Sequence, residues 1–370
     1  MAGVAPAVRL YLQPLGLLAG ESAQVALDRG WARPLGEGGI AFTACRIRVR
    51  EPSGFAQSIV PVSALENWSE AKGEAVGAAL ARVLARLSAR PALPATPRPE
   101  TPLIMGVVNV TPDSFSDGGR FFRLSDAIAQ GQRLWQEGAA IIDVGGESTR
   151  PGAAPVPAEE EIDRVVPVVR ALAEAGIEVS IDSRKAAVMA AAIEAGARMI
   201  NDVSALRHDP ESLRLAAGSG LPVVLMHSQG DPATMQRNPT YEDVTLDVYD
   251  ELEERVEACV AAGISRQRLL IDPGIGFGKT LAHNIDLLNG LSLYLGMGLP
   301  VVLGASRKAF IGRLADEAAA SERLPGSLAA ALLGLANGAS MIRAHDVGAT
   351  RQAVRVWQAV MLGAPAAAAC

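Results

Sequence analysis

Short apolar runs alternate with amphipathic stretches along most of the chain, from residue 103 onward. The runs are too short for buried helices and lack helical polar spacing, so each one predicts a buried strand. There are eight of them, over residues 103–110, 140–144, 177–181, 199–203, 222–226, 269–271, 300–303 and 340–342.

Helical patterns lie between these runs, and glycines stand where several of the helices should end. The helical patterns cover 125–137, 159–175, 184–195, 243–262, 328–337 and 350–361, and the glycines are Gly138, Gly176, Gly196, Gly263 and Gly338. Such an alternation of eight strands with helices is typical of a (β/α)8 TIM barrel, which commonly takes about 250 residues. A doubly wound open sheet is the alternative, because the sequence does not reveal the order of the strands.

The first 90 residues do not show this alternation. They contain two short candidate strands, 42–49 and 58–62, and one helical pattern, 71–87. Residues 91–99 read P-A-L-P-A-T-P-R-P, which suits neither a helix nor a central strand and predicts a linker over 91–101. We therefore expect a small α+β extension over 1–90, to which no activity can be assigned, and a barrel over 102–370.

Polar side chains stand at the end of nearly every predicted strand. In a barrel the C-terminal ends of all strands meet at one face, so these side chains should converge. They are Asn109, Glu147, Ser148, Thr149, Arg150, Asp182, Asn201, His227, Asp272, Ser306, Arg307, Lys308, Arg343 and His345. Side chains also alternate between the faces of a strand, which predicts that Asn201 faces a ligand and that Asp202 has a structural role.

One group within this set suits an anion. Arg343 and His345 should point together from one strand and, with Arg150 from another loop, form a small site suited to phosphate. Asn109 offers a hard oxygen, of the kind that Mg2+ accepts when phosphates and waters complete its octahedron.

A second group suits a flat nitrogen heterocycle. Buried carboxylates and an amide can accept hydrogen bonds from ring N–H and exocyclic NH2 donors, and the candidates are Asp182, Asn201 and Asp272. Lys308 can donate to a carbonyl or a ring nitrogen of the same ligand. Met226 could line this pocket, although a lone methionine is more often a core residue.

A glycine-rich stretch, D-P-G-I-G-F-G-K-T over 272–280, follows the sixth predicted strand. Its spacing is one residue shorter than the G-x-x-x-x-G-K-[ST] pattern requires, which excludes a Walker A loop. We interpret it as a turn that lets a ligand approach the backbone.

The composition of the chain indicates which classes of partner to exclude and which cellular compartment to expect. The net charge is −6 and the Lys and Arg residues are scattered, which argues against a nucleic-acid partner. No run reaches the roughly 18 apolar residues of a membrane span, and no basic leader precedes the mildly apolar N-terminus. The three cysteines are far apart in the sequence. These features predict a cytoplasmic protein in a reducing compartment, without a membrane partner.

Seven blocks, in order, resemble the dihydropteroate synthase family. They are V-V-N-V-T-P-D-S-F-S-D-G-G (107–119), D-V-G-G-E-S-T-R-P-G (143–152), S-I-D-S-R-K (180–185), I-N-D-V (200–203), D-P-G-I-G-F-G-K (272–279), G-A-S-R-K (304–308) and R-A-H-D-V (343–347). The likeness covers residues 102–361 and implies a pterin-binding TIM barrel, usually a homodimer. It implies a transferase of folate biosynthesis that uses Mg2+. Such an enzyme condenses 6-hydroxymethyl-7,8-dihydropterin diphosphate with p-aminobenzoate to give 7,8-dihydropteroate and diphosphate.

The resemblance also implies roles for matching residues. The pterin would be held by Asp182, Asn201, Asp272 and Lys308, and the diphosphate with its magnesium by Asn109, Thr149, Arg150, Arg343 and His345. The p-aminobenzoate pocket, where sulfonamides compete, would be shaped by Phe115, Ser116, Thr149, Pro151, Phe277, Ser306 and Lys308. Asp117 would receive the amine proton. Two positions beside the assigned ligands depart from the family pattern. The chain has Ser228 where the family often has methionine, and it has S-I-D-S-R-K where D-T-x-K is commoner.

Two other functions fit parts of the pattern. A pterin-dependent methyltransferase would keep the pterin-facing Asp and Asn groups but needs no diphosphate site, and the pairing of Arg343 with His345 argues against it. A non-catalytic pterin-binding paralogue would not need the two loops 109–119 and 145–152 together. The chain contains both, which argues against this alternative.

Overall fold

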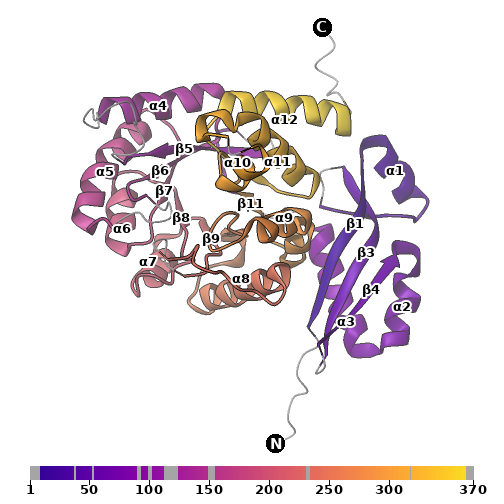
Figure 1. The fold of residues 1–370 in the computed structure, drawn as a ribbon. Coiled ribbons are helices and arrows are strands. Elements are labelled where there is room, and N and C mark those ends of the chain that lie inside the picture. Colours follow the sequence, from indigo (N-terminus) through magenta and orange to yellow (C-terminus); the bar gives the residue numbers. More distant parts are fainter. Residues whose placement is uncertain are drawn as a thin grey trace, which may run out of the picture.

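The computed structural model shows a barrel of alternating strands and helices with a smaller α+β unit beside it (Figure 1). It describes residues 9–36, 39–51, 54–89, 93–98, 102–111, 124–148, 155–230, 234–316 and 318–363. The described helices include none with the length and apolarity that a membrane crossing requires.

Within the described residues, eight parallel strands form the barrel, one from each apolar run. They are β5 (Leu103–Asn109), β6 (Ile141–Gly145), β7 (Val179–Asp182), β8 (Met199–Asp202), β9 (Val223–Met226), β10 (Leu269–Asp272), β11 (Val302–Leu303) and β12 (Met341–Ala344). Their order is β10-β9-β8-β7-β6-β5-β12-β11. A parallel bridge joins Ile271 of β10 to Val301, next to β11, so the sheet curls into a nearly closed ring. The barrel prediction is confirmed, and the open-sheet alternative is wrong because the two edge strands meet.

Helices cover the outside of the ring (Figure 1). They are α4 (Leu124–Glu137), α5 (Ala158–Glu174), α6 (Ala186–Glu194), α7 (Ser212–Ser219), α8 (Val244–Ala261), α9 (Leu281–Asn289), α10 (Ala309–Leu314), α11 (Leu324–Ala336) and α12 (Val347–Leu362), with the 3-10 helices η3 (Arg266–Arg268), η4 (Leu291–Met297) and η5 (Ala320–Glu322). Capping side chains and glycines define the ends of several of these helices. The Asp243 side chain accepts hydrogen bonds from two N–H groups at the start of α8. Gly138, just after α4, has φ +108°, a conformation that glycine adopts without strain.

The interior of the barrel has an apolar layer and a polar layer. The apolar layer, nearer the N-terminal ends of the strands, includes Leu103, Met105, Ile141, Met199, Val224, Leu270, Val302 and Met341. Because side chains alternate along a strand, a residue two positions further on faces the same interior. On several strands that residue is polar, so the apolar layer supports a polar layer at the C-terminal ends.

The N-terminal unit is an antiparallel sheet with helices. It contains β1 (Leu10–Ala19), α1 (Gly20–Asp28), β2 (Arg33–Pro34), β3 (Ile40–Glu51), β4 (Gly54–Pro61), η1 (Val62–Ala64), α2 (Leu65–Lys72) and α3 (Glu74–Ser88). The central strand β3 pairs with β1 on one side and with β2 and β4 on the other. The α+β character predicted for this segment is confirmed. The single helical pattern over 71–87 is wrong in detail, because Gly73, with φ +90°, separates α2 from α3.

The N-terminal unit packs against the outer helices of the barrel (Figure 1). Asp250 on α8 accepts hydrogen bonds from Tyr11 of β1 (2.8 Å) and Arg50 of β3 (3.0 Å). Arg48, on the same face of β3 as Arg50, bonds Asp243 at 2.7 Å. Basic side chains of the sheet thus meet acidic side chains of α8, and buried apolar residues continue from one unit into the other.

Candidate active site

Strand register brings the predicted site residues to one end of the barrel. Asp143, Asn201, Met226, Asp272 and Arg343 each follow a residue of the apolar layer by two positions, so they face the interior. In the ladders, Asp182 is the partner of Asn201, and Asp272 is the partner of Met226. The convergence expected from the sequence is therefore a result of the register of β6 to β12.

Arg343 lies between two buried carboxylates. Its Nε donates to Asp143 Oδ2 and one of its terminal NH2 groups donates to Asp182 Oδ2, both at 2.7 Å. The amide of Asn201 also donates to Asp143 Oδ2, at 2.9 Å. Within the described residues the second oxygen of Asp143 has no hydrogen-bond partner. Arg343 is thus held beside the proposed pterin-facing residues Asp182 and Asn201.

The charges in this group shift one another's protonation. Burial raises the pKa of Asp182 to about 7, although the neighbouring Arg343 guanidinium opposes the shift. Burial lowers the pKa of Arg343, but Asp143 and Asp182 outweigh it and raise that pKa above its ordinary value. Arg343 therefore stays charged, whereas Asp182 can change its protonation near neutral pH.

Asp272, Lys308 and Arg343 surround one small space. A methyl group built on Gly304 would lie 3.5 Å from Asp272 Oδ2, 3.8 Å from Lys308 Nζ and 3.9 Å from Cβ of Arg343. Glycine at this position leaves the space open between the three side chains. Burial lowers the pKa of Lys308 to about 8, and burial raises the pKa of Asp272 while Lys308 lowers it. Lys308 thus provides a hydrogen-bond donor beside this space, Asp272 provides an acceptor, and Arg343 provides a positive charge.

Ser306 and His345 contact each other at the ends of β11 and β12. The Ser306 hydroxyl lies 3.1 Å from His345 Nδ1 and accepts a hydrogen bond from the His345 backbone N–H at 3.2 Å. Arg307, between Ser306 and Lys308, forms an ion pair with Asp346. These contacts fix the turn after β11 to the end of β12.

Phe277 lies under Lys308, because the Lys308 amine is 4.6 Å from the centroid of the Phe277 ring. Asn109 ends β5 next to Gly145 of β6, and Met226 is buried beside Asp272. The structure therefore brings together Asn109, Asp182, Asn201, Met226, Asp272, Phe277, Ser306, Lys308, Arg343 and His345 at the C-terminal ends of the strands. The remaining predicted residues, Phe115, Ser116, Asp117, Thr149, Arg150 and Pro151, lie outside the described residues.

Comparison with known proteins decides the family. The model of the pterin binding enzyme family matches residues 105–345, and all of that match lies in the barrel. The chain belongs to the pterin binding enzyme family. Among curated relatives, the dihydropteroate synthase of Haemophilus influenzae is 48% identical over 259 residues, which are 70% of this chain and 94% of the relative.

Solved structures of pterin binding enzymes share the fold. A Xanthomonas albilineans dihydropteroate synthase with 4-aminobenzoic acid has a TM-score of 0.67 at 49% identity, covering 72% of this chain and 95% of that one. A second structure of a dihydropteroate synthase from that organism is a complex with 7,8-dihydropteroate, with a TM-score of 0.65 at 46% identity and the same two coverages. The Yersinia pestis dihydropteroate synthase, in a complex with a sulfonamide drug, has a TM-score of 0.68 at 48% identity, covering 70% of this chain and 94% of that one.

Asp143 is the main site residue that the sequence reasoning missed. It stands in the apolar run I-I-D-V-G, is fully buried, and contacts both Arg343 and Asn201. The signal was available in the strand alternation, because Ile141 belongs to the apolar interior layer and Asp143 follows it by two positions.

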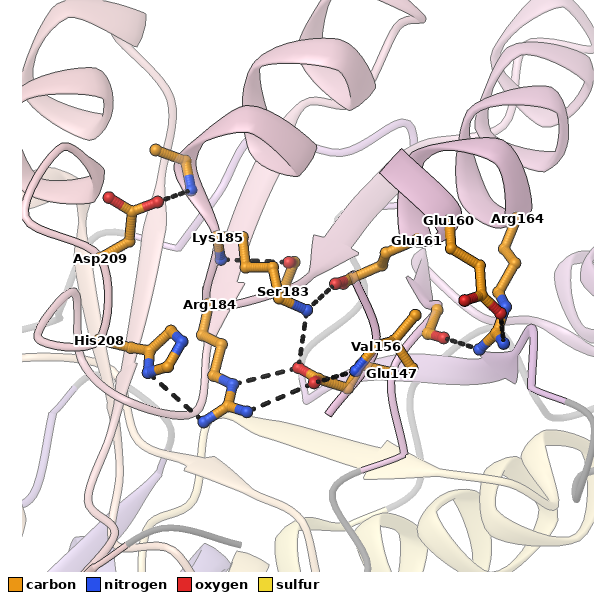
Figure 2. Close-up of polar contacts among 12 residues, drawn as sticks. Glu147, Val156, Glu160, Glu161, Arg164, Ser183, Arg184, Lys185, His208 and Asp209 are labelled. Carbon is orange, nitrogen blue, oxygen red and sulfur yellow. Dashed lines mark hydrogen bonds and ion pairs between the residues drawn. The ribbon is translucent and has the colours of Figure 1, made fainter. Parts of the chain in front are cut away.

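A second set of buried charges lies beside the site, around Glu147 (Figure 2). The Glu147 carboxylate pairs with Arg184 and Lys185, both at 3.1 Å, and accepts from the backbone N–H of Val156 at 3.1 Å. Lys185 also pairs with Glu161, which is fully buried. Glu147 precedes the sequence 149–154, and its carboxylate binds Val156, which follows that sequence. The same carboxylate binds Arg184 and Lys185, just after β7. In the sequence Glu147 was one of many strand-end polar residues, without an assigned role.

Proposed function

We propose that the chain is a dihydropteroate synthase, a transferase that condenses 6-hydroxymethyl-7,8-dihydropterin diphosphate with p-aminobenzoate to give 7,8-dihydropteroate and diphosphate. The observation that carries this proposal is Arg343, held between Asp143 and Asp182 beside the space that Asp272 and Lys308 also border. The proposed heterocycle site and anion site would thus meet in a chain whose match covers 94% of a named dihydropteroate synthase.

The pterin ring would bind to the carboxylates and the amide in the polar layer. Asp182 and Asp272 would accept from ring N–H and exocyclic NH2 groups, and Lys308 would donate to the ring carbonyl or a ring nitrogen. Asn201, whose amide donates to Asp143, keeps its carbonyl oxygen for the ligand. Met226 would contact the ring face. Asn201, Met226 and Asp272 are buried, and the hydrogen bonds of the group would orient the pterin methylene towards the strand ends.

The diphosphate would leave towards Arg343, His345, Thr149 and Arg150. Charge develops on the diphosphate as its bond to the pterin methylene breaks, and fixed cations stabilise that charge without reorganising. We propose that Mg2+ assists by neutralising the same charge, with the side-chain oxygen of Asn109 as its protein ligand. The hard amide oxygen at the end of β5, adjacent to the site, supports this assignment.

The second substrate would reach the methylene from the side of Phe277 and Lys308. Phe115, Ser116, Thr149, Pro151 and Ser306 would complete the p-aminobenzoate pocket, the pocket in which sulfonamides would compete. A neutral aniline is nucleophilic enough to attack the carbocation-like methylene, so no strong general base is needed. The lost proton would pass to Asp117.

We further propose a cytoplasmic homodimer. Exposed apolar side chains support the dimer, because Val356 and Val360 on α12 and Leu333 on α11 face outward from two helices that pack together. The buried thiols of Cys45 and Cys259 are not joined in disulfides, as is usual in a reducing compartment.

An assay of diphosphate release tests the proposed reaction. Purified protein, the pterin diphosphate and Mg2+ should release diphosphate only when p-aminobenzoate is present, with 7,8-dihydropteroate as the second product. A pterin-dependent methyltransferase would bind the pterin and release no diphosphate. Tight pterin binding without p-aminobenzoate-dependent release would refute the synthase proposal and favour a non-catalytic pterin-binding protein.

A further inference from the structure

The glycine-rich turn after β10 is held by side chains from several elements. Four consecutive backbone carbonyls, from residue 275 to residue 278, each accept a hydrogen bond from a side chain. The donors to them, in order, are Lys308, Gln236 (2.6 Å), Lys279 (2.9 Å) and Tyr241 (2.8 Å). A turn fixed at four successive peptides has little freedom to change the direction of the Phe277 ring.

Lys279 is the buried member of this set, with 3% of its surface exposed. Its amine donates to the Phe277 carbonyl and lies 2.9 Å from Nδ1 of His227, which is also 3% exposed. Burial lowers the pKa of His227 to about 4, so the imidazole is neutral near pH 7. Nδ1 then accepts from Lys279, which leaves the proton on Nε2, 3.5 Å from a carboxylate oxygen of Glu251.

The turn also packs directly on the backbone that follows β9. A methyl group on Gly274 would lie 1.8 Å from the His227 carbonyl oxygen, and one on Gly278 would lie 2.6 Å from that of Gln229. Only glycine allows this approach at both positions. Lys279 is therefore buried between the turn and the residue that follows β9, and the Phe277 ring of the same turn lies against Lys308.

An apolar side chain would fill this buried position at a lower desolvation cost than an amine. The amine is paired with a neutral imidazole and a carbonyl, and the nearby Lys308 repels it. The amine thus contacts one imidazole nitrogen and one peptide carbonyl, and that carbonyl belongs to Phe277, whose ring faces Lys308.

We propose that Lys279, oriented by His227, is a positioning residue that sets the Phe277 ring against Lys308 and thereby shapes the p-aminobenzoate pocket. The proposal rests on the proposed function, because it assigns Phe277 to that pocket. Lys279 acts through the Phe277 peptide and does not itself touch either substrate.

The substitution Lys279→Met tests this role, because it keeps the length of the side chain and removes the amine. The KM for p-aminobenzoate should rise at least tenfold, while kcat and the Kd of a phosphate-free pterin change less than threefold. Tyr241→Phe is the matched control. It removes the hydroxyl that donates to the Gly278 carbonyl and keeps the ring, whose centroid lies 6.0 Å from Lys279 Nζ. The KM of this variant for p-aminobenzoate should change less than threefold.

Two variants of His227 separate positioning from general stability. His227→Asn keeps an oxygen near the place of Nδ1 and should keep the KM for p-aminobenzoate within threefold of wild type. His227→Leu removes the acceptor and should raise that KM as Lys279→Met does. An unchanged KM in Lys279→Met, or equal losses in KM, kcat and pterin affinity, would overturn the proposal. These His227 variants decide it if Lys279→Met does not fold.

Hydrogen exchange distinguishes failure of this proposal from failure of the proposed function. Amides of residues 275–279 should exchange at least tenfold faster in Lys279→Met than in wild type, and less than threefold faster in Tyr241→Phe. A wild-type protein without p-aminobenzoate-dependent diphosphate release would refute the synthase function. The exchange rates would still show whether Lys279 fixes the turn, and unchanged rates would refute the inference.

Discussion

Arg343 and Asp143 form an ion pair at the centre of the polar layer, although they lie 200 positions apart in the chain. The Nε of Arg343 is 2.7 Å from Oδ2 of Asp143, whose side chain is fully buried. The same oxygen accepts from Asn201, so one carboxylate orients both a cation and an amide of the proposed site. Asp143 thus orients one residue of the proposed diphosphate site, Arg343, and one of the proposed pterin site, Asn201.

Replacing Asp143 by Asn should weaken both folding and pterin binding. The variant keeps the shape but removes the charge, leaving Arg343 with Asp182 alone. Breaking a buried ion pair typically costs 3–5 kcal/mol, and because Asp182 remains we expect about 3 kcal/mol in the free energy of unfolding, measured with denaturant. Asp209→Asn is the control at a partly exposed carboxylate that accepts from the backbone N–H of Ala186, and it should cost below about 1 kcal/mol. Equal losses in both variants would contradict the assigned role of Asp143.

The affinity for a phosphate-free pterin should depend on pH through Asp182. Its pKa of about 7 is set first by burial, and only the ionised carboxylate accepts from the N–H donors of the ring. Affinity should therefore be constant above pH 7 and fall about tenfold per unit as the pH drops below it. Calorimetry between pH 5.5 and 8 measures this profile. Asp182→Asn should bind more weakly and without the slope, and a flat wild-type profile would exclude Asp182 as the acceptor.

His345→Ala should separate the diphosphate site from the pterin site. His345 follows Arg343 by two positions and contacts Ser306, but no hydrogen bond between described residues joins it to Asp143 or Asp182. Loss of one group that stabilises developing charge typically lowers kcat about 100-fold, and we expect that effect in the diphosphate-release assay. The Kd of a phosphate-free pterin should stay within threefold of wild type. A parallel loss of pterin affinity would place His345 on the pterin instead.

Because Arg343 forms ion pairs with two carboxylates, the Arg343→Ala variant should lose pterin binding as well as turnover. Removing the guanidinium leaves two buried carboxylates, Asp143 and Asp182, without their shared partner. Arg343 lowers the pKa of Asp182, so without it Asp182 would be protonated more readily, and pterin binding would fall together with turnover. The sequence places Arg343 beside His345 in a predicted phosphate site and does not show that Asp143 and Asp182 pair with it.

Much of the barrel was visible in the sequence because each strand is short, apolar and separated from the next by a helix. The polar strand ends were visible for the same reason. Asp143 was not, because a single carboxylate within an apolar run gives no sign of its partners. The pairing of Lys279 with His227, 52 positions apart, likewise depends on how closely the turn after β10 approaches β9.

The N-terminal unit was harder to predict. Pro14 and Gly16 interrupt the apolar pattern of β1, and the sequence did not predict a strand there. In the structure this strand pairs with β3 on one side, and on the barrel side the Pro14 carbonyl accepts from Ser292 of η4. A proline costs no ladder bond at such an edge, so tertiary contact stabilises a strand that local propensity disfavours.

His227 should make the stability of the fold sensitive to mild acid. Burial lowers its pKa in the folded state to about 4, whereas the pKa in the unfolded chain is about 6.5. The unfolded state therefore binds the proton more readily, and the contribution is fully present above pH 6.5 and lost as the pH falls towards 4. The difference of about 2.5 units corresponds to about 3 kcal/mol. Denaturant unfolding of wild type and His227→Asn at several pH values measures this contribution. Wild type should lose about 3 kcal/mol of stability relative to His227→Asn as the pH falls from 6.5 to 4, and parallel curves would show that His227 is not the group that titrates.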